Sequence, residues 1–233
     1  MKDREIDDIL KRAADVPHDI DPAVLTHVTE SIESSLRPVR PLPRTWVLAV
    51  SLVVICVAIA MAGAALLGFH GIYNLSVLQR ALIFFALAIF LGLVSMECVG
   101  QVIPGSRQRA TPGVLLGVGV LALLGVFAIL FRDYRAEQFM HQGIACLLAG
   151  LLFAIPAGLV GWFVLRRGFA VNPGAAGLAV GTLAGLAGLA MLELHCANFE
   201  APHVMLWHTA VVPISAAAGA LLGWGLHRLR RLP

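Results

Sequence analysis

Long apolar runs separated by short polar segments dominate the chain from about residue 45 onwards. A helix needs about 20 apolar residues to cross the hydrocarbon core of a bilayer, and six runs reach that length. They lie at approximately Trp46–Gly68, Val77–Val99, Gly113–Phe131, Gly143–Leu165, Gly174–Leu194 and Val204–Leu226. No Lys or Arg interrupts the middle of any run. The pattern predicts an all-α fold: a polytopic membrane protein whose residues 45–233 form a bundle of six transmembrane helices.

Residues 1–44 follow a different pattern, with apolar positions spaced as on one face of a helix. Asp21 and Pro22 are typical of a helix start, because Asp caps the helix and Pro fits its first position. Two short amphipathic helices cannot bury a core by themselves, so their apolar faces need a partner. Their polar faces are largely acidic, which disfavours anionic lipid and favours a protein partner. A passive tail is the alternative. The partner-binding candidates are Ile6, Ile9, Leu10, Leu25, Val28 and Ile32.

Composition and charge agree with a membrane protein. Hydrophobic residues make up 59% of the chain and its mean hydropathy is +0.85, which excludes an ordinary soluble domain. Short segments after the second, fourth and sixth runs, and the segment before the first, carry bases without acids. The positive-inside rule therefore predicts that both termini are cytoplasmic. We expect the bases to set membrane topology and not to bind nucleic acid.

Small residues recur in the last two runs. Gly177, Gly181 and Gly185 repeat every fourth residue, and the sixth run contains Gly219 and Gly223 at the same spacing. Strips of small residues let neighbouring transmembrane helices approach closely. These glycines predict a tightly packed bundle and need no further function.

The candidate chemistry lies in the stretch Glu193–His208, which joins the fifth and sixth runs and contains His195, Cys196 and His203 as well. The fourth run begins on the same side of the membrane, so its Cys146 should lie at the depth of Cys196. The two thiols could form a redox pair on the oxidising side of the membrane. With the histidines, they could instead bind zinc or copper. The third alternative is that these are interface anchors and packed side chains without a chemical role.

Catalytic motifs are missing from the sequence, which contains no nucleophile turn, no Gly-rich phosphate loop and no HExxH. We therefore expect no enzyme. Ionisable residues are nearly absent from the apolar runs, which argues against transport. Two further alternatives are a metal- or haem-binding membrane redox protein and a structural bundle.

The order of several short motifs resembles the NrsF family of bacterial membrane anti-sigma factors. The motifs are Leu36–Pro43 before the first run, Cys146 with Pro156 and Leu165–Gly168 in the fourth, Asn172–Gly177 opening the fifth, and Leu194–Cys196 followed by Trp207. Together they cover the chain from about Leu36 to its C-terminus.

The resemblance implies a function that composition does not show. The cytoplasmic N-terminal segment would hold an extracytoplasmic-function sigma factor at the inner membrane, and a signal at the outer face would release it. Cys146 and Cys196 match the family's cysteine pair, which makes them sensing candidates, with His195, His203 and His208 beside them. The tail is longer and more acidic than we expect for the family, so family binding residues are not carried over to it. His208 stands where we expect an aromatic residue, which gives this outer site a more metal-like character.

Overall fold

The computed structural model describes residues 8, 11, 21–35, 43–103, 111–136, 139–165 and 172–229. Within these ranges the regular structure is helical. The helices are α2 (Pro22–Ser35), α3 (Thr45–Leu67), α4 (His70–Asn74), α5 (Val77–Val102), α6 (Pro112–Leu130), α7 (Phe139–Leu165), α8 (Pro173–His195), α9 (Ala201–His203), the π-helix η1 (Val204–His208) and α10 (Thr209–Leu229). The chain divides into two compact units, Met1–Leu42 and Pro43–Pro233.

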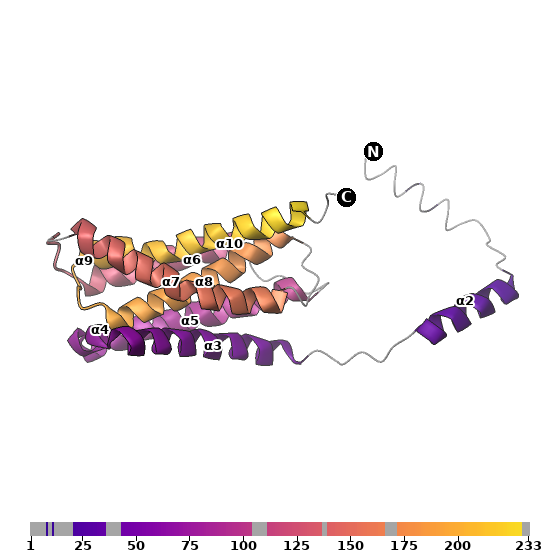
Figure 1. Cartoon of the computed structure of the whole chain (residues 1–233), viewed down its shortest axis with the longest axis horizontal. Coiled ribbons are helices and arrows are strands. Elements are labelled where there is room, and N and C mark those ends of the chain that lie inside the picture. The colour runs from indigo at the N-terminus through magenta and orange to yellow at the C-terminus, as the bar shows by residue number, and fades with distance from the viewer. Residues whose placement is uncertain are drawn as a thin grey trace. The chain divides into compact units, whose positions relative to one another are not determined.

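The second unit is the predicted bundle of six long helices (Figure 1). Each is long and apolar enough to cross a membrane, and each corresponds to one of the six runs. Apolar side chains such as Leu121, Ile129 and Leu152 point outwards and are exposed by 61–71%. An apolar exterior suits a surface that faces lipid. The prediction of an all-α bundle with six candidate transmembrane helices is confirmed.

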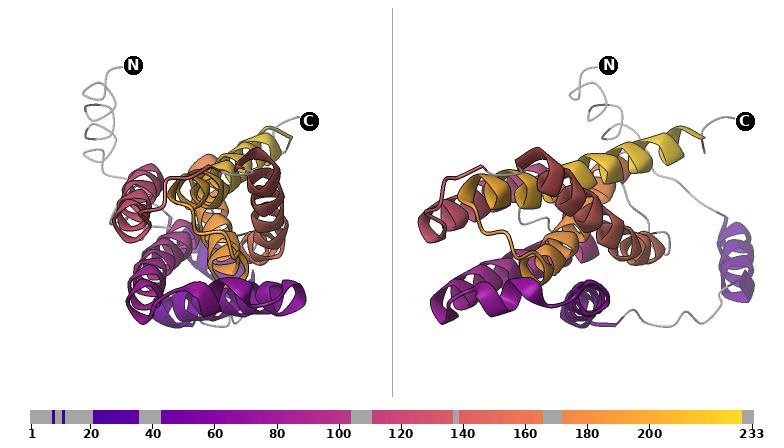
Figure 2. Two further views of the ribbon diagram at one scale, coloured as in Figure 1. Left: turned by 90° about the vertical axis from the view of Figure 1, so that its left-hand side faces the viewer. Right: turned by 60° about the vertical axis from the view of Figure 1, so that its left-hand side comes forward.

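Helix α8 occupies the centre of the bundle, and the other long helices surround it (Figure 2). Its side chains are buried almost without interruption from Ala176 to Leu194. The sequence explains how it begins, since Asn172 accepts a hydrogen bond from the Ala175 amide and Pro173 occupies the first turn. Residues at the C-terminal end of α8 are therefore packed against neighbouring helices.

Backbone contact joins α8 to α10. A Cβ atom at Gly177 would collide with the carbonyl oxygen of Gly219, and one at Gly181 would collide with that of Ser215. A Cβ at Gly185 would lie 2.6 Å from the Cα of Val212. The glycine strips predicted from the sequence do bring the two helices together, and no side chain fits between them.

The first unit contains α2, which begins where the sequence predicts. The Ala23 amide donates to Asp21 Oδ1 over 2.9 Å, as in an N-cap. Leu25, Val28 and Ile32 lie on one face of the helix and are each about half exposed. The other partner-binding candidates, Ile6, Ile9 and Leu10, lie outside the described residues.

Candidate functional site

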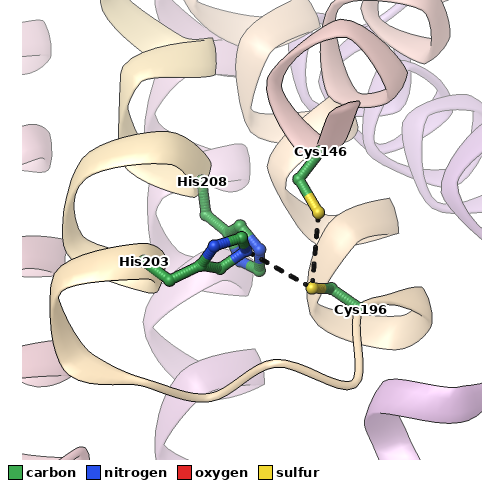
Figure 3. Close-up of side chains that lie close together, drawn as sticks. All are labelled: Cys146, Cys196, His203 and His208. Carbon is green, nitrogen blue, oxygen red and sulfur yellow. Dashed lines mark hydrogen bonds between the residues drawn. The ribbon is translucent and has the colours of Figure 1, made fainter. Parts of the chain in front are cut away.

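Four side chains from three parts of the bundle meet at the end where α7 begins and α8 ends (Figure 3). Cys146 comes from the second turn of α7, Cys196 follows the last residue of α8, and His203 and His208 come from α9 and η1. We call these four residues the Cys/His cluster. The sulfur atoms of Cys146 and Cys196 are 3.4 Å apart, and both cysteines are free thiols. The two cysteines therefore lie side by side, as we expect of residues at one depth.

The π-helix explains how both histidines join the cluster. In a regular α-helix, residues five apart point in directions that differ by about 140°, because 3.6 residues complete a turn. A π-turn bonds each amide to the carbonyl five residues back and has more residues per turn, so residues five apart point in more similar directions. The Thr209 amide makes such a bond to the Val204 carbonyl. His203 and His208 therefore share a face, with ring centroids 5.2 Å apart.

The cluster is compact and largely shielded from solvent. One ligand atom from each of the four side chains lies within 4.8 Å of all the others. Cys196, His203 and His208 are buried and Cys146 is half-buried. The distance from Cys196 Sγ to His203 Nε2 is 3.6 Å. The hydrogen bond with Cys146 and, after it, burial raise the pKa of the Cys196 thiol above its ordinary value.

Glu193 supports the cluster from behind. Its Oε1 atom lies 2.8 Å from His208 Nδ1, and both side chains are fully buried. The interpretation of the sequence assigned Glu193 no role. The sequence does show that Glu193 is a carboxylate in the last turn of an apolar helix, where the helix macrodipole disfavours negative charge. Such a residue needs a partner, and His208 from the next helix provides it.

His195 does not join the cluster, although it was a sensing candidate beside the other histidines. Its Nδ1 atom lies 2.9 Å from the carbonyl oxygen of Gly68, which can only accept, so this nitrogen donates. Its ring packs edge-on against His70 at 5.7 Å. His195 thus connects the end of α8 to the α3–α4 corner.

Trp207 packs against the start of α7. A Cβ atom at Gly143 would collide with its indole ring, so the glycine makes room for it. The indole also packs on Phe139 at 5.4 Å between ring centroids. On another side, Asn198 donates to Gln142 Oε1 over 2.7 Å and so fastens the α8–α9 connection to α7.

A cavity of about 380 Å³ opens beside the α8–α9 connection. The ends of α5 and α6 and residues 197–200 line it, with Arg132, Asp133 and Glu200 among its polar side chains. The carbonyl of Asn198, which borders this cavity, accepts a hydrogen bond from the Cys196 thiol over 3.8 Å. The cavity therefore comes within one residue of the cluster.

Two kinds of chemistry suit four such groups. The paired thiols can be oxidised to a disulfide after a shift of little more than 1 Å, because the bond itself is about 2.05 Å long. Two thiolates and two imidazoles are also a common donor set for a tetrahedral metal ion. The described residues hold no second group of three or more His, Cys, Asp or Glu ligand atoms as close together.

Comparison with known proteins assigns the chain to a family. Residues 33–229 match the family described as "NrsF: Negative regulator of sigma F". A stretch of 127 residues is 28% identical to "Probable anti-sigma-F factor NrsF" of Azospira oryzae, covering 52% of this chain and 58% of that protein. No solved structure matches the chain. Since the family match extends over all six long helices and the Cys/His cluster, the chain belongs to the NrsF family of negative regulators of sigma F.

Proposed function

We propose that the protein is a bacterial inner-membrane anti-sigma factor. It holds an extracytoplasmic-function sigma factor through its cytoplasmic N-terminal segment and releases it when an oxidant or a metal acts on the Cys/His cluster at the outer face. The proposed sensing role of the Cys/His cluster rests on the 3.4 Å separation of the Cys146 and Cys196 sulfur atoms. Its role is regulatory, in a stress response, and not enzymatic.

The arrangement of the bundle supports this division of labour. Helix α3 begins and α10 ends at the end of the bundle opposite α4 and α9 (Figure 1). The segment that leads into α3 follows the proposed sigma-binding unit, and bases flank both points in the sequence. With these bases in the cytoplasm, the cluster faces outwards.

Helix α2 provides the surface for the sigma factor. Leu25 and Val28 are each about half exposed. Apolar side chains on one face of a helix are stabilised when they are buried against a partner. Glu30 and Glu33 lie on the same helix and can complement basic surfaces of a partner. An amphipathic helix with apolar anchors one turn apart suits docking into a hydrophobic groove.

An oxidant acts on the thiols by a simple two-electron reaction. With a peroxide as oxidant, the two thiols of Cys146 and Cys196 together lose two protons and two electrons, and the S–S bond forms. The peroxide takes up these protons and electrons, and its O–O bond breaks to give water or an alcohol and water. The disulfide then joins α7 to the end of α8. Because α8 is closely packed along its length, a shift of its end should also displace the helices that contact it.

The sigma-binding surface is tested by Val28→Asp in the full chain. A carboxylate in the centre of the apolar face should weaken binding of the sigma factor by about ten- to a hundredfold, as loss of one hot-spot residue does. Affinity is measured with the purified full chain and the sigma factor, and release in cells with a sigma-dependent reporter. Thr26→Asp is the matched control, because it replaces another β-branched residue two positions away on a different face. Equal binding by both variants would contradict this surface.

A further inference from the structure

The distances within the Cys/His cluster agree with those around a tetrahedral zinc ion. Zinc–sulfur bonds of about 2.3 Å and zinc–nitrogen bonds of about 2.05 Å imply about 3.8 Å between sulfurs and about 3.6 Å from sulfur to nitrogen. Here the sulfurs are 3.4 Å apart and Cys196 Sγ lies 3.6 Å from His203 Nε2. The four ligand atoms all lie within 4.8 Å of one another, so they could surround one ion after movements of about 1 Å.

His208 has a free nitrogen for such an ion. Its Nε2 atom is buried, and the described part of the chain offers it no hydrogen bond of good geometry. A buried nitrogen without a partner costs free energy, which coordination to a metal would recover. The ring is fully shielded, so solvent cannot take that place.

Glu193 determines which way the His208 ring presents its nitrogens. Its carboxylate lies against Nδ1 and accepts the proton of that atom, so that in the neutral ring, the form that binds a metal, Nε2 carries the lone pair. Metal-binding histidines commonly have a carboxylate behind them in this arrangement, which fixes the tautomer and strengthens the ligand.

The charge of the donor set favours a divalent ion. Two thiolates match the charge of one divalent cation, whereas a monovalent ion would leave one more uncompensated negative charge in a buried site that already contains the Glu193 carboxylate. Two sulfurs and two nitrogens in a tetrahedral arrangement are typical of zinc. Asp133, Glu200 and Arg132 line the neighbouring cavity, and Asn198, whose carbonyl accepts from Cys196, borders it.

We propose that Cys146, Cys196, His203 and His208 bind one zinc-class divalent cation, and that Glu193 is the positioning residue that holds His208 towards it. The inference names the ligand of the site in the proposed function and rests on that function only for its regulatory meaning. Metal binding by the purified protein needs no sigma factor, so the two can fail separately.

The test uses the full chain in detergent with Co²⁺ as a spectroscopic probe and Zn²⁺ as competitor. One Co²⁺ per chain should give the visible absorption of a tetrahedral site and a thiolate-to-cobalt band, and Zn²⁺ should displace it. Cys196→Ser should weaken the thiolate band. Glu193→Leu should lower Zn²⁺ affinity by about 10- to 100-fold, whereas Glu193→Gln, which keeps an oxygen to accept the Nδ1 proton, should retain most of it.

Glu97→Leu is the matched control, since Glu97 is another buried acid and accepts a hydrogen bond from Gln101 in α5. It should leave the spectrum unchanged. Equal Zn²⁺ affinity in Glu193→Leu and Glu193→Gln would overturn the positioning role. Absence of a tetrahedral Co²⁺ spectrum, or Cu⁺ binding that ignores His208→Ala and excludes Zn²⁺, would overturn the site even if sigma release still required the thiols.

Discussion

Replacing Cys146 and Cys196 by serine is expected to keep the sigma factor held but to abolish its release. Serine retains the size and a hydroxyl at each position, so the bundle should persist. It cannot form a disulfide, and it replaces the two thiolates that a soft metal prefers. A sigma-dependent reporter should stay at its uninduced level when cells receive peroxide or a soft divalent metal such as Cd²⁺. The parent protein should respond to at least one of them.

Cys56→Ser provides the control for this experiment. Cys56 is buried in α3 among apolar neighbours and takes no part in the Cys/His cluster. Its replacement should leave induction intact. If the double variant responds like the parent, the cluster is not the sensor. If reporter activity is high without any oxidant or metal, the thiols are needed to keep the sigma factor bound and do not trigger its release.

Gly181→Ala should destabilise the bundle by about 1–3 kcal/mol, because overpacking of a closely fitted interior has this cost. The new methyl group would meet the carbonyl oxygen of Ser215 and the Cα of Ala216, and backbone cannot rotate away as a side chain can. Helix α10 must move off α8, and it carries His208 away from Cys196 as it moves. Thermal unfolding in detergent measures the first effect, and the yield of oxidative Cys146–Cys196 cross-linking reports on the cluster end.

Gly125→Ala is the matched control, since a methyl group there meets nothing within 4 Å. Its stability should equal or exceed that of the parent, because alanine favours a helix more than glycine does. Equal stability of the two variants would show that α8 and α10 are less closely packed than described.

The six long helices were predictable because length and hydropathy alone decide whether a helix can span a bilayer. Most of their ends agree to within a few residues. The sixth run, predicted from Val204, begins with the π-helix η1, so that α10 itself begins only at Thr209. Helix α7 begins at Phe139, before the apolar run predicted from Gly143. The polar residues His141 and Gln142 ended the run in the sequence, yet a helix needs no apolar side chains in its first turn. The glycines of α8 predicted close packing but not its central place, because a strip of small residues does not say how many neighbouring helices pack against it.

The four members of the Cys/His cluster could be named from topology, since antiparallel helices bring their ends together. Their local geometry could not. A spacing of five between His203 and His208 argues against a shared face unless the backbone forms a π-turn, and nothing in Val204–His208 announces one. The direction of His195 and the pairing of Glu193 with His208 depend on which side of α8 each neighbour occupies. Such choices are made by tertiary packing.

The central position of α8 also bears on how the chain is inserted into the membrane. The spans that contain α8 and α10 have the lowest mean hydropathies of the six. In α8, 89% of the most apolar 18-residue segment is buried inside the bundle. A span of this kind gains less than its neighbours from lipid and carries the costly Glu193 near one end. The short connection 196–200 and the glycine contacts suit α8 and α10 to enter the bilayer as one hairpin. The helix around which the others assemble is thus the one that depends most on a companion during biogenesis.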